Sequence, residues 1–427
     1  MESILLNTYK ELKTELREHI LDYWINNTID QDSGGFIGKI TSDGETDKNA
    51  PKSAILHARI LWTFSAAYNF FKDERYLKVA ERAYKYMEDS FWDREFGGVF
   101  WMIKQNGEPL DTKKHVYVQA FAIYGYSEYY KASNNKNALF QAIELKRYIE
   151  KFSYQPETNG YYEAFDRKWH KLDDVRLGET DIQETYSMNT HLHILEAYTN
   201  LHSVWKNELL QKRLNQLIRV HLDKMFDYES DHFKSFFDSD WNSKSNTYSY
   251  GHDIEAIWLL TDATKKLPDK ALYNEVSDVA KKVAYKVVSE GLDKTDGGIF
   301  NSGSSNEVVD DDKHWWVQAE AMVGFLEAYR ITGDQVFMNA INNIWSFVKK
   351  HIKDSKNGEW FFRVSKEGIP YMNEDKVGPW KCPYHNSRAC LEFLRRLSVQ
   401  DFDLYKNNEK WKTDFSEKKS VNKFNAS

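Results

Sequence analysis

Apolar positions recur at helical spacing along most of the chain, in two alternating kinds of segment. In the first kind, one face is apolar and the other charged, as in 75–90, 139–151, 209–225, 271–290 and 337–351. In the second kind, apolar and aromatic residues occupy nearly every position, as in Ile123–Tyr126 and Met322–Leu326. The pattern predicts amphipathic outer helices that alternate with helices buried on all sides.

The alternation is an internal repeat. Six segments open with a related five-residue pattern, 59 to 75 residues apart, beginning at Leu56, Val118, His193, His252, Val317 and His385. Turns rich in small residues, each followed by aromatics, lie between them, at 33–36, 96–100, 159–162, 296–300 and 357–361. Their Gly residues tolerate positive φ, and the aromatics that follow suit short strands or tight hairpins.

Two helices in each of six repeats give about twelve helices, which predicts an all-α (α/α)6 barrel with short hairpins in its connecting loops. An open solenoid is the structural alternative. Closure is favoured because unusual polar residues recur at equivalent inner positions, and a closed ring would direct them into one cavity. We expect a single catalytic domain over 1–400. The Lys- and Asn-rich stretch 401–427 is expected to be a C-terminal extension or frayed tail of unknown role.

Composition narrows the class of protein. The chain has 427 residues, of which 15% are aromatic, and a formal net charge of -7. A mildly acidic protein without a basic field is a poor nucleic-acid partner, and no apolar run is long enough to cross a membrane. The N-terminus lacks the apolar core of a secretory signal. Two cysteines, Cys382 and Cys390, are too few for a disulfide framework. A cytoplasmic enzyme is the simplest interpretation.

Polar residues gather on the inner helices. His193, His252 and His385 are each followed three residues later by a charged residue, namely Glu196, Glu255 and Arg388, and Arg59 and Asn189 lie on inner faces as well. Buried polar groups are costly without partners, so we expect this set to line a wet site. One such histidine alone would more often be a hydrogen-bonded core residue. His191 and His193 cannot face the same way, and the repeat alignment selects His193 as the inward one.

These residues could in principle bind either a metal ion or a sugar. Three histidines could form a zinc shell, but they lie on three helices, no His-Glu-x-x-His pair is present and an arginine shares the ring, so no metal is expected. Tyr117, Trp315, Trp316 and Trp380 stand at the starts of inner helices or in the loops before them. There they would rim a barrel mouth and stack on sugar rings. Packing between the helical rings is the alternative for each of them.

The chain resembles the N-acylglucosamine 2-epimerase superfamily and, within it, the epimerases of β-1,4-linked disaccharides. The resemblance runs from about residue 10 to about residue 400. Its motifs are His57–Trp62, Asn189–Tyr198, Gly251–Ala256, Trp315–Glu320 and Trp380–Asn386. It implies an (α/α)6 barrel and cofactor-independent epimerisation at C2 of the reducing-end sugar of disaccharides such as cellobiose and lactose, through ring opening and a cis-enediolate.

The resemblance also implies roles. His252 and His385 are the acid/base pair, Glu255 orients His252, and His193 assists ring opening or holds the O1/O2 side. Arg59 stabilises the enediolate oxygen, Asn189 and Tyr117 bind hydroxyls, and Trp315, Trp316 and Trp380 contact the sugars. Histidine suits both proton steps because its ordinary pKa is about 6.5.

Several alternatives remain open at this stage. A mannobiose 2-epimerase, an N-acylhexosamine epimerase or an aldose–ketose isomerase would use the same site. A glycoside hydrolase on this barrel would need a carboxylate pair, for which Glu255 and Glu320 are candidates. A non-catalytic sugar-binding protein is a third class. The protein would act as a monomer or homodimer.

Overall fold

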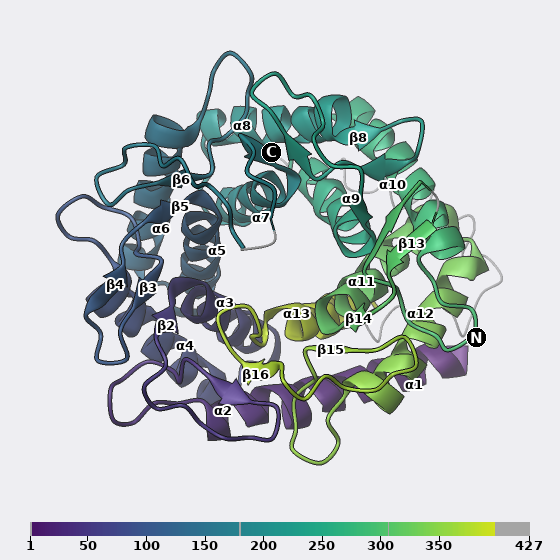
Figure 1. Cartoon of the computed structure of the whole chain (residues 1–427), viewed down its shortest axis with the longest axis horizontal. Helices are drawn as coiled ribbons and strands as arrows, with labels where there is room; N and C mark the ends of the chain where they lie inside the picture. The colour runs from purple at the N-terminus through teal and green to yellow at the C-terminus, as the bar shows by residue number, and fades with distance from the viewer. Residues whose placement is uncertain (1, 179–180, 306, 398–427) are drawn as a thin grey trace, which may run out of the picture.

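The computed structural model describes residues 2–178, 181–305 and 307–397, so the predicted extension 401–427 lies outside the described residues. Among the described residues, two concentric rings of helices form a barrel (Figure 1). Each inner helix packs on the next, and α13 packs on α3, which closes the ring. The expected (α/α)6 barrel is therefore confirmed, and an open solenoid is excluded for this part of the chain.

The inner helices are apolar nearly all round because they pack against neighbours on both sides and against the outer ring. Four of them are capped at the N-terminus by a side chain that accepts a hydrogen bond from a backbone N–H of the first turn. These N-cap residues are Ser53, His115, Ser187 and Ser249. The inner helices are α3 (Ala54–Phe71), α5 (Val116–Ser133), α7 (Met188–Val204), α9 (Tyr250–Thr264), α11 (Trp315–Thr332) and α13 (Tyr384–Arg396).

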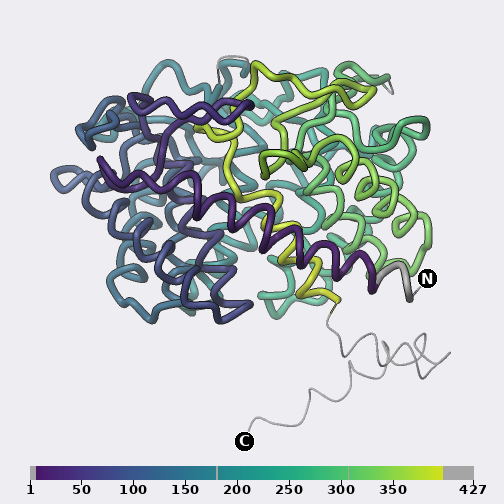
Figure 2. The backbone as a smooth tube through the Cα atoms, turned by 90° about the horizontal axis from the view of Figure 1, so that it is seen from below, coloured from purple at the N-terminus to yellow at the C-terminus, as the bar shows by residue number. Residues whose placement is uncertain are grey.

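The outer helices follow the predicted amphipathic segments. Five of the six outer positions include a π-helical turn, η1 (Glu15–Leu21), η2 (Met87–Phe91), η3 (Ile149–Ser153), η4 (His221–Met225) or η5 (Val348–Ile352). The outer α-helices are α1 (Glu2–Thr14), α2 (Asp22–Asn27), α4 (Glu74–Tyr86), α6 (Lys136–Tyr148), α8 (Glu208–Val220), α10 (Lys270–Glu290) and α12 (Gln335–Phe347). Figure 2 shows the N-terminal helix, in purple, lying against the last inner helix, which completes the outer ring at the seam.

Short antiparallel strands link consecutive repeats at one end of the barrel, called here the hairpin end. The strand before an inner helix pairs with a strand from the following repeat, as in Ser53 opposite Met102. The sheets are β2 (Lys52–Ser53) with β3 (Met102–Ile103) and β4 (Pro109–Asp111), β5 (Lys114–His115) with β6 (Ala164–Phe165), β7 (Tyr186–Ser187) with β10 (Phe236–Phe237), β8 (Phe226–Asp227) with β9 (His232–Phe233), β11 (Tyr248–Ser249) with β12 (Ser302–Ser304) and β13 (Glu307–Asp310), and β14 (Lys313–His314) with β15 (Arg363–Val364). A further pair, β1 (Ile40–Thr41) with β16 (Asp375–Val377), joins the first repeat to the last.

The small-residue turns also form as predicted, and they take positive φ at residues such as Gly97 and Gly98. A matching turn in the fourth repeat escaped the pattern because it contains no glycine. There Asp231 adopts the left-handed conformation, with φ of 57°, between β8 and β9.

In the part of the chain that the structure describes, no helix has the length and apolarity that crossing a membrane requires.

Candidate functional site

One side chain near the start of each inner helix anchors a hairpin turn and thereby sets the rotation of the helix. His57 accepts the backbone N–H of Phe36 at 3.2 Å, and Gln119 accepts that of Val99 at 2.9 Å. The equivalent anchors in the next three repeats are His191, Asp253 and Gln318, at 3.0, 2.8 and 2.8 Å. In the last repeat Asn386 donates to Glu359, which itself accepts the N–H of Trp360.

The residue two positions after each anchor faces the barrel axis. These six residues are Arg59, Phe121, His193, Glu255, Glu320 and Arg388, and we call them the axial ring. They contact one another: the Arg59 guanidinium lies 4.2 Å from the centre of the Phe121 ring, and Phe121 lies 4.7 Å from His193. Glu255 and Glu320 both bind Arg388.

The axial ring corrects the sequence alignment of the third repeat. The sequence aligned His193 with His252 and His385, whereas the structure places Thr190, just before the anchor His191, at that position. The alignment was wrong by three residues, nearly one helical turn. His193 nevertheless faces inward as predicted, because it occupies the axial-ring position.

Arg388 lies at the centre of a buried network with no exposed side-chain surface. Its Nη1 donates to Glu196 and to the Tyr384 hydroxyl, and its Nη2 donates to Glu255. The same Nη2 lies 2.7 Å from Glu320 Oε1. Burial disfavours ionisation of Glu196, but Arg388 and then His193 lower its pKa to about 2.

Two of the three predicted histidines are held by carboxylates. His193 Nδ1 lies 2.9 Å from Glu196 Oε2, and His385 Nδ1 lies 2.7 Å from Glu320 Oε1. Burial, followed by Arg59 and Arg388, lowers the pKa of His385 well below its ordinary value. This direction favours a neutral imidazole for His385.

His252 has a different environment. Its half-buried ring forms no hydrogen bond with any other side chain that the structure describes, and it lies 4.8 Å from the ring of Trp316. Trp316 also lies 5.7 Å from His385, so the two predicted acid/base histidines, on α9 and α13, share one aromatic wall. Burial, followed by His193, lowers the pKa of His252 to about 3.

The prediction that Glu255 orients His252 is wrong. Although the two residues are separated by one turn, Glu255 reaches across the axis to Arg388, and its second carboxylate oxygen is buried with no hydrogen-bond partner among the described residues. Burial and then the neighbouring Glu320 raise the pKa of Glu255 to about 7, against the opposing effect of Arg388. A carboxyl group buried this deeply keeps its proton into the neutral range.

Arg59 and Tyr117 lie together on the other side of the axis. Arg59 Nη2 donates to the Tyr117 hydroxyl at 2.8 Å, and the Cys382 sulfur lies 3.8 Å from Nη1. The ring of Tyr117 contacts that of His193 edge-on, at 5.0 Å. A guanidinium and a phenol therefore stand next to the imidazole of His193, where they can bind oxygen atoms of a ligand.

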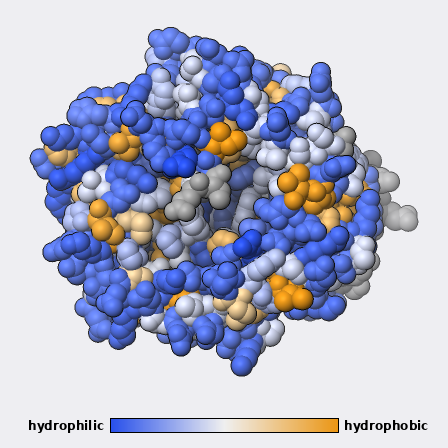
Figure 3. All heavy atoms as spheres, in the orientation of Figure 1, coloured by the Kyte–Doolittle hydropathy of each residue, from blue (hydrophilic) through white to orange (hydrophobic). Residues whose placement is uncertain are grey.

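A cleft of about 430 Å³ opens at the hairpin end, on the side of His252 and Trp316. Asn189 lines it as well, together with Ser249, Asn301 and His314 from the short strands and loops around it. Figure 3 shows the hollow at the centre of this face, bordered mostly by hydrophilic residues. Trp380 is half-buried and lies 6.3 Å from Tyr117 and 6.0 Å from Trp101, in keeping with a place at the mouth.

Trp315 lies deeper than the predicted rim position. Its side chain is 3% exposed, and its ring centre lies 4.6 Å from that of Phe362 and 6.0 Å from that of His385. Contact of this side chain with a sugar stays a prediction. Two adjacent residues on a helix point about 100° apart, so only Trp316 of the pair can face the cleft.

One group in the network has the composition of a metal site. The ligand atoms of Glu255, Glu320 and His385 all lie within 4.8 Å of one another. The guanidinium of Arg388, however, already binds both carboxylates. A fixed positive charge at that place opposes a cation, so the donor set does not suit a metal ion.

The sequence places Glu196 and Arg388 in the set expected to line a wet site but gives them no individual role, and it names Glu320 only as a candidate carboxylate of a hydrolase. A sequence signal for the network exists, because Glu320 and Arg388 stand two positions after the anchors Gln318 and Asn386. Glu196 follows His193 by one turn and could be recognised by that spacing.

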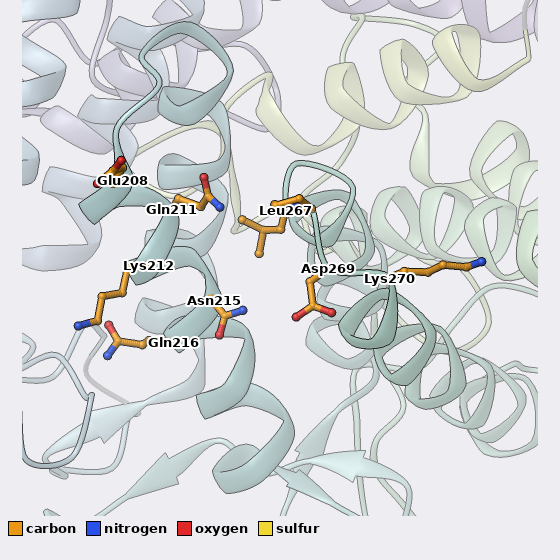
Figure 4. Close-up of a pocket in the computed structure, with 9 residues that line it drawn as sticks. Glu208, Gln211, Lys212, Asn215, Gln216, Leu267, Asp269 and Lys270 are labelled. Atoms are coloured by element: carbon orange, nitrogen blue, oxygen red, sulfur yellow. The ribbon is translucent and has the colours of Figure 1, made fainter. Parts of the chain in front are cut away.

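Other cavities lie outside the hairpin-end cleft, including two that are at least as large as it. One, of about 770 Å³, is on the outer surface (Figure 4), where Gln211 and Asn215 of α8 face Leu267 and Asp269 in the segment before α10. The other, of about 440 Å³, is at the opposite end of the barrel, behind Glu196 and Trp258. Neither cavity brings a histidine and a carboxylate together.

Comparison with known proteins gives a consistent result. The model of the N-acylglucosamine 2-epimerase (GlcNAc 2-epimerase) family matches residues 35–389. The cellobiose 2-epimerase of Bacteroides fragilis is 46% identical over 385 residues, which cover 90% of this chain and 98% of that protein. The cellobiose 2-epimerase of Dictyoglomus turgidum is 39% identical over 393 residues, covering 91% and 99%.

A solved structure agrees with these relatives. The structure of cellobiose 2-epimerase from Bacillus thermoamylovorans superposes with a TM-score of 0.87 at 40% sequence identity. The superposition covers 92% of this chain and all of that one.

Proposed function

The chain belongs to the N-acylglucosamine 2-epimerase family and is an isomerase of the epimerase type, and from this premise we propose that it interconverts glucose and mannose at the reducing end of cellobiose. The observation that carries the proposal is the convergence of His252 and His385 on one aromatic wall beside Arg59. Lactose has the same reducing-end glucose in β-1,4 linkage and would be a second substrate.

The chemistry requires a base, an acid and an oxyanion site. Opening of the sugar ring exposes an aldehyde at C1, which acidifies the hydrogen on C2. One of the two histidines removes that proton to give a cis-enediolate, and the other returns a proton to the opposite face of C2. Both rings would be neutral before the reaction because burial lowers their pKa, so either can begin as the base.

The enediolate is an anion, and the hairpin end favours anions. Arg59, with Tyr117 at its side, would bind the O1/O2 edge, and His193 would exchange a proton with O1 or O5 during ring opening. All six inner helices also begin at this end, so the positive ends of their dipoles surround the intermediate. The negative charge of the intermediate raises the pKa of both histidines, so the base keeps the proton that it removed from C2. The other histidine takes up a proton from solvent and delivers it to the opposite face of C2, and the base afterwards releases its own proton to solvent.

The cleft has room for a second sugar ring. With Trp316 beside the reacting carbons, Trp380 would support the sugars toward the mouth, and Asn189 would bind a hydroxyl. A monosaccharide would leave the outer part of the cleft empty, which favours a disaccharide substrate.

An NMR time course of cellobiose in deuterated water tests the proposal. We expect glucosyl-mannose to appear, with deuterium at its C2, because one histidine removes the proton and another returns one. A glucosyl-fructose product would instead indicate an isomerase, and free glucose a hydrolase. Unchanged cellobiose, together with turnover of N-acetylglucosamine, would contradict the proposed substrate.

A further inference from the structure

We propose that Arg388 is a positioning residue that fixes the orientation and tautomer of His193 and His385 together, through Glu196 and Glu320. The catalytic consequence rests on the proposed function, in which both histidines act on the sugar, whereas the tautomers can be measured without it.

The first link is between the guanidinium and the two carboxylates. Nη1 of Arg388 donates to Glu196 and Nη2 lies 2.7 Å from Glu320, so one planar group holds carboxylates from α7 and α11. The guanidinium is confined between two aromatic rings, 4.3 Å from the centre of Tyr384 and 4.8 Å from that of Trp258. A fork held flat in this way has little freedom to release either carboxylate.

The second link is between each carboxylate and a histidine. Glu196 reaches His193 Nδ1 at 2.9 Å, and Glu320 reaches His385 Nδ1 at 2.7 Å. The two oxygens of Glu320 already receive Arg388 and the indole N–H of Trp258, the latter at 3.1 Å. An ionised carboxylate only accepts hydrogen bonds, so Nδ1 of each ring must carry the proton. The lone pair is then on Nε2, the nitrogen that no described residue binds.

Arginine is required because the network needs several donors in one plane. The guanidinium serves Glu196, Glu255, Glu320 and the Tyr384 hydroxyl at once, whereas the ammonium of a lysine has three donors without a fixed geometry. Lysine would preserve the positive charge but could not hydrogen-bond Glu196 and Glu320 at the same time in one plane. The Arg388→Lys variant therefore separates positioning from charge.

The test combines kinetics on cellobiose with ¹⁵N NMR of the histidine rings, which distinguishes protonation at Nδ1 from protonation at Nε2. In the wild type we expect His193 and His385 each in the Nδ1–H tautomer. In Arg388→Lys we expect both to become tautomer mixtures. We also expect kcat to fall roughly 10- to 100-fold with KM nearly unchanged, because Arg388 is buried beneath the substrate.

The control is Arg395→Lys. Arg395 lies two turns further along α13 and pairs with Glu392 at 2.8 Å, outside the network. It should leave both tautomers and kcat as in the wild type. Single tautomers and a wild-type kcat in Arg388→Lys would overturn the proposal. Mixed tautomers of His193 and His385 in the wild-type protein would overturn the positioning role as well. If the wild type does not epimerise cellobiose but both histidines are in the single Nδ1–H tautomer, only the proposed function is contradicted.

A second variant covers the case in which Arg388→Lys does not fold. Arg388→Met combined with Glu255→Gln removes the guanidinium together with the carboxyl group of Glu255 that it binds, so Glu255 is not left as a buried ionisable group without its partner. Mixed tautomers at both histidines in this folded double variant support the positioning role, and unchanged tautomers exclude it.

Discussion

His385 and His252 occupy the same place in two repeats, immediately before the anchors Asn386 and Asp253, yet their surroundings differ. His385 is 6% exposed and tied to Glu320, whereas His252 is half-buried and open to the cleft. Both contact Trp316. Equivalent backbone positions have therefore produced one held imidazole and one that is free to rotate.

The cause of the difference is the axial-ring residue of the preceding helix. For His385 that residue is Glu320 on α11, a carboxylate. For His252 it is His193 on α7, an imidazole that lowers the pKa of His252 after the larger effect of burial. The repeat determines where each histidine stands, and a single side chain on the neighbouring helix determines its hydrogen bonding.

The largest expected effect comes from removing either ring. We expect His252→Ala and His385→Ala each to lower kcat on cellobiose by about 10³-fold or more, because each ring serves one face of C2. The comparison predicts a difference in rescue by added imidazole. His252→Ala opens a space toward the cleft and should recover roughly 10-fold or more, whereas the enclosed space left by His385→Ala should recover little.

Circular dichroism would show that both alanine variants remain folded. Substantial activity in either variant without imidazole would refute the two-histidine assignment. If added imidazole restored the activity of both variants equally, the two ring sites would be equally accessible from the cleft, which would contradict the comparison.

The next effect concerns Glu255, which is on the helix of His252 but belongs to the network of Arg388. Burial and the neighbouring Glu320 raise its pKa from 4.5 to about 7, so between these pH values the folded state holds a proton on Glu255 that the unfolded state releases. We expect the stability that this proton contributes to be complete below about pH 4.5 and to be lost as the pH rises through about 7, by a few kcal/mol in order of magnitude. Glu255→Gln should remove that loss.

Urea unfolding at pH 5 and pH 8 measures the effect. Glu163→Gln is the matched comparison, because burial also raises the pKa of Glu163 to about 7, while the hydrogen bonds to its carboxylate come from Ser187 and Thr190 and not from Arg388. Both variants should flatten the pH dependence of the unfolding free energy. A wild-type slope in Glu255→Gln would mean that Glu255 is ionised in the folded protein.

A smaller effect is expected from Glu320→Gln, which makes His385 resemble His252. The amide can still accept from Nδ1 but no longer binds Arg388 as an ion, so the ring loses part of its orientation. We expect kcat to fall about 10-fold with KM close to that of the wild type. A change in KM alone would show that Glu320 acts on substrate binding and not on the base.

Much of the fold could be predicted because its signals are periodic. Residues such as Tyr76, Val79 and Ala83 define an amphipathic outer helix, and Gly97 and Gly98 define a turn that tolerates positive φ. The fourth turn was missed because Asp231 adopts that conformation without being a glycine. The inward side chains His193, His252 and His385 were also found, since polar residues on buried helices stand out against their neighbours.

The pairing of those side chains could not be predicted from spacing within a helix. The one-turn rule is right for His193 with Glu196, and wrong for His252 with Glu255. The partner of His385 comes from another helix, 65 residues earlier in the chain. Contacts across the axis depend on the rotation of every helix in the ring, and the anchors that set this rotation become visible only when the hairpins are in place.

The smallest expected effect tests the wall that the two histidines share. Trp316→Phe keeps an aromatic ring but shortens it, so we expect kcat/KM on cellobiose to fall only about three- to tenfold. The ring centre of Trp316 is 4.8 Å from His252 and 5.7 Å from His385. The ring C–H signals of His252 should therefore shift more in the proton NMR spectrum than those of His385, which Glu320 holds in place. If the signals of His385 shifted as much as those of His252, the hydrogen bond to Glu320 would not restrict the His385 ring. The proposed difference between the two histidines would then be wrong.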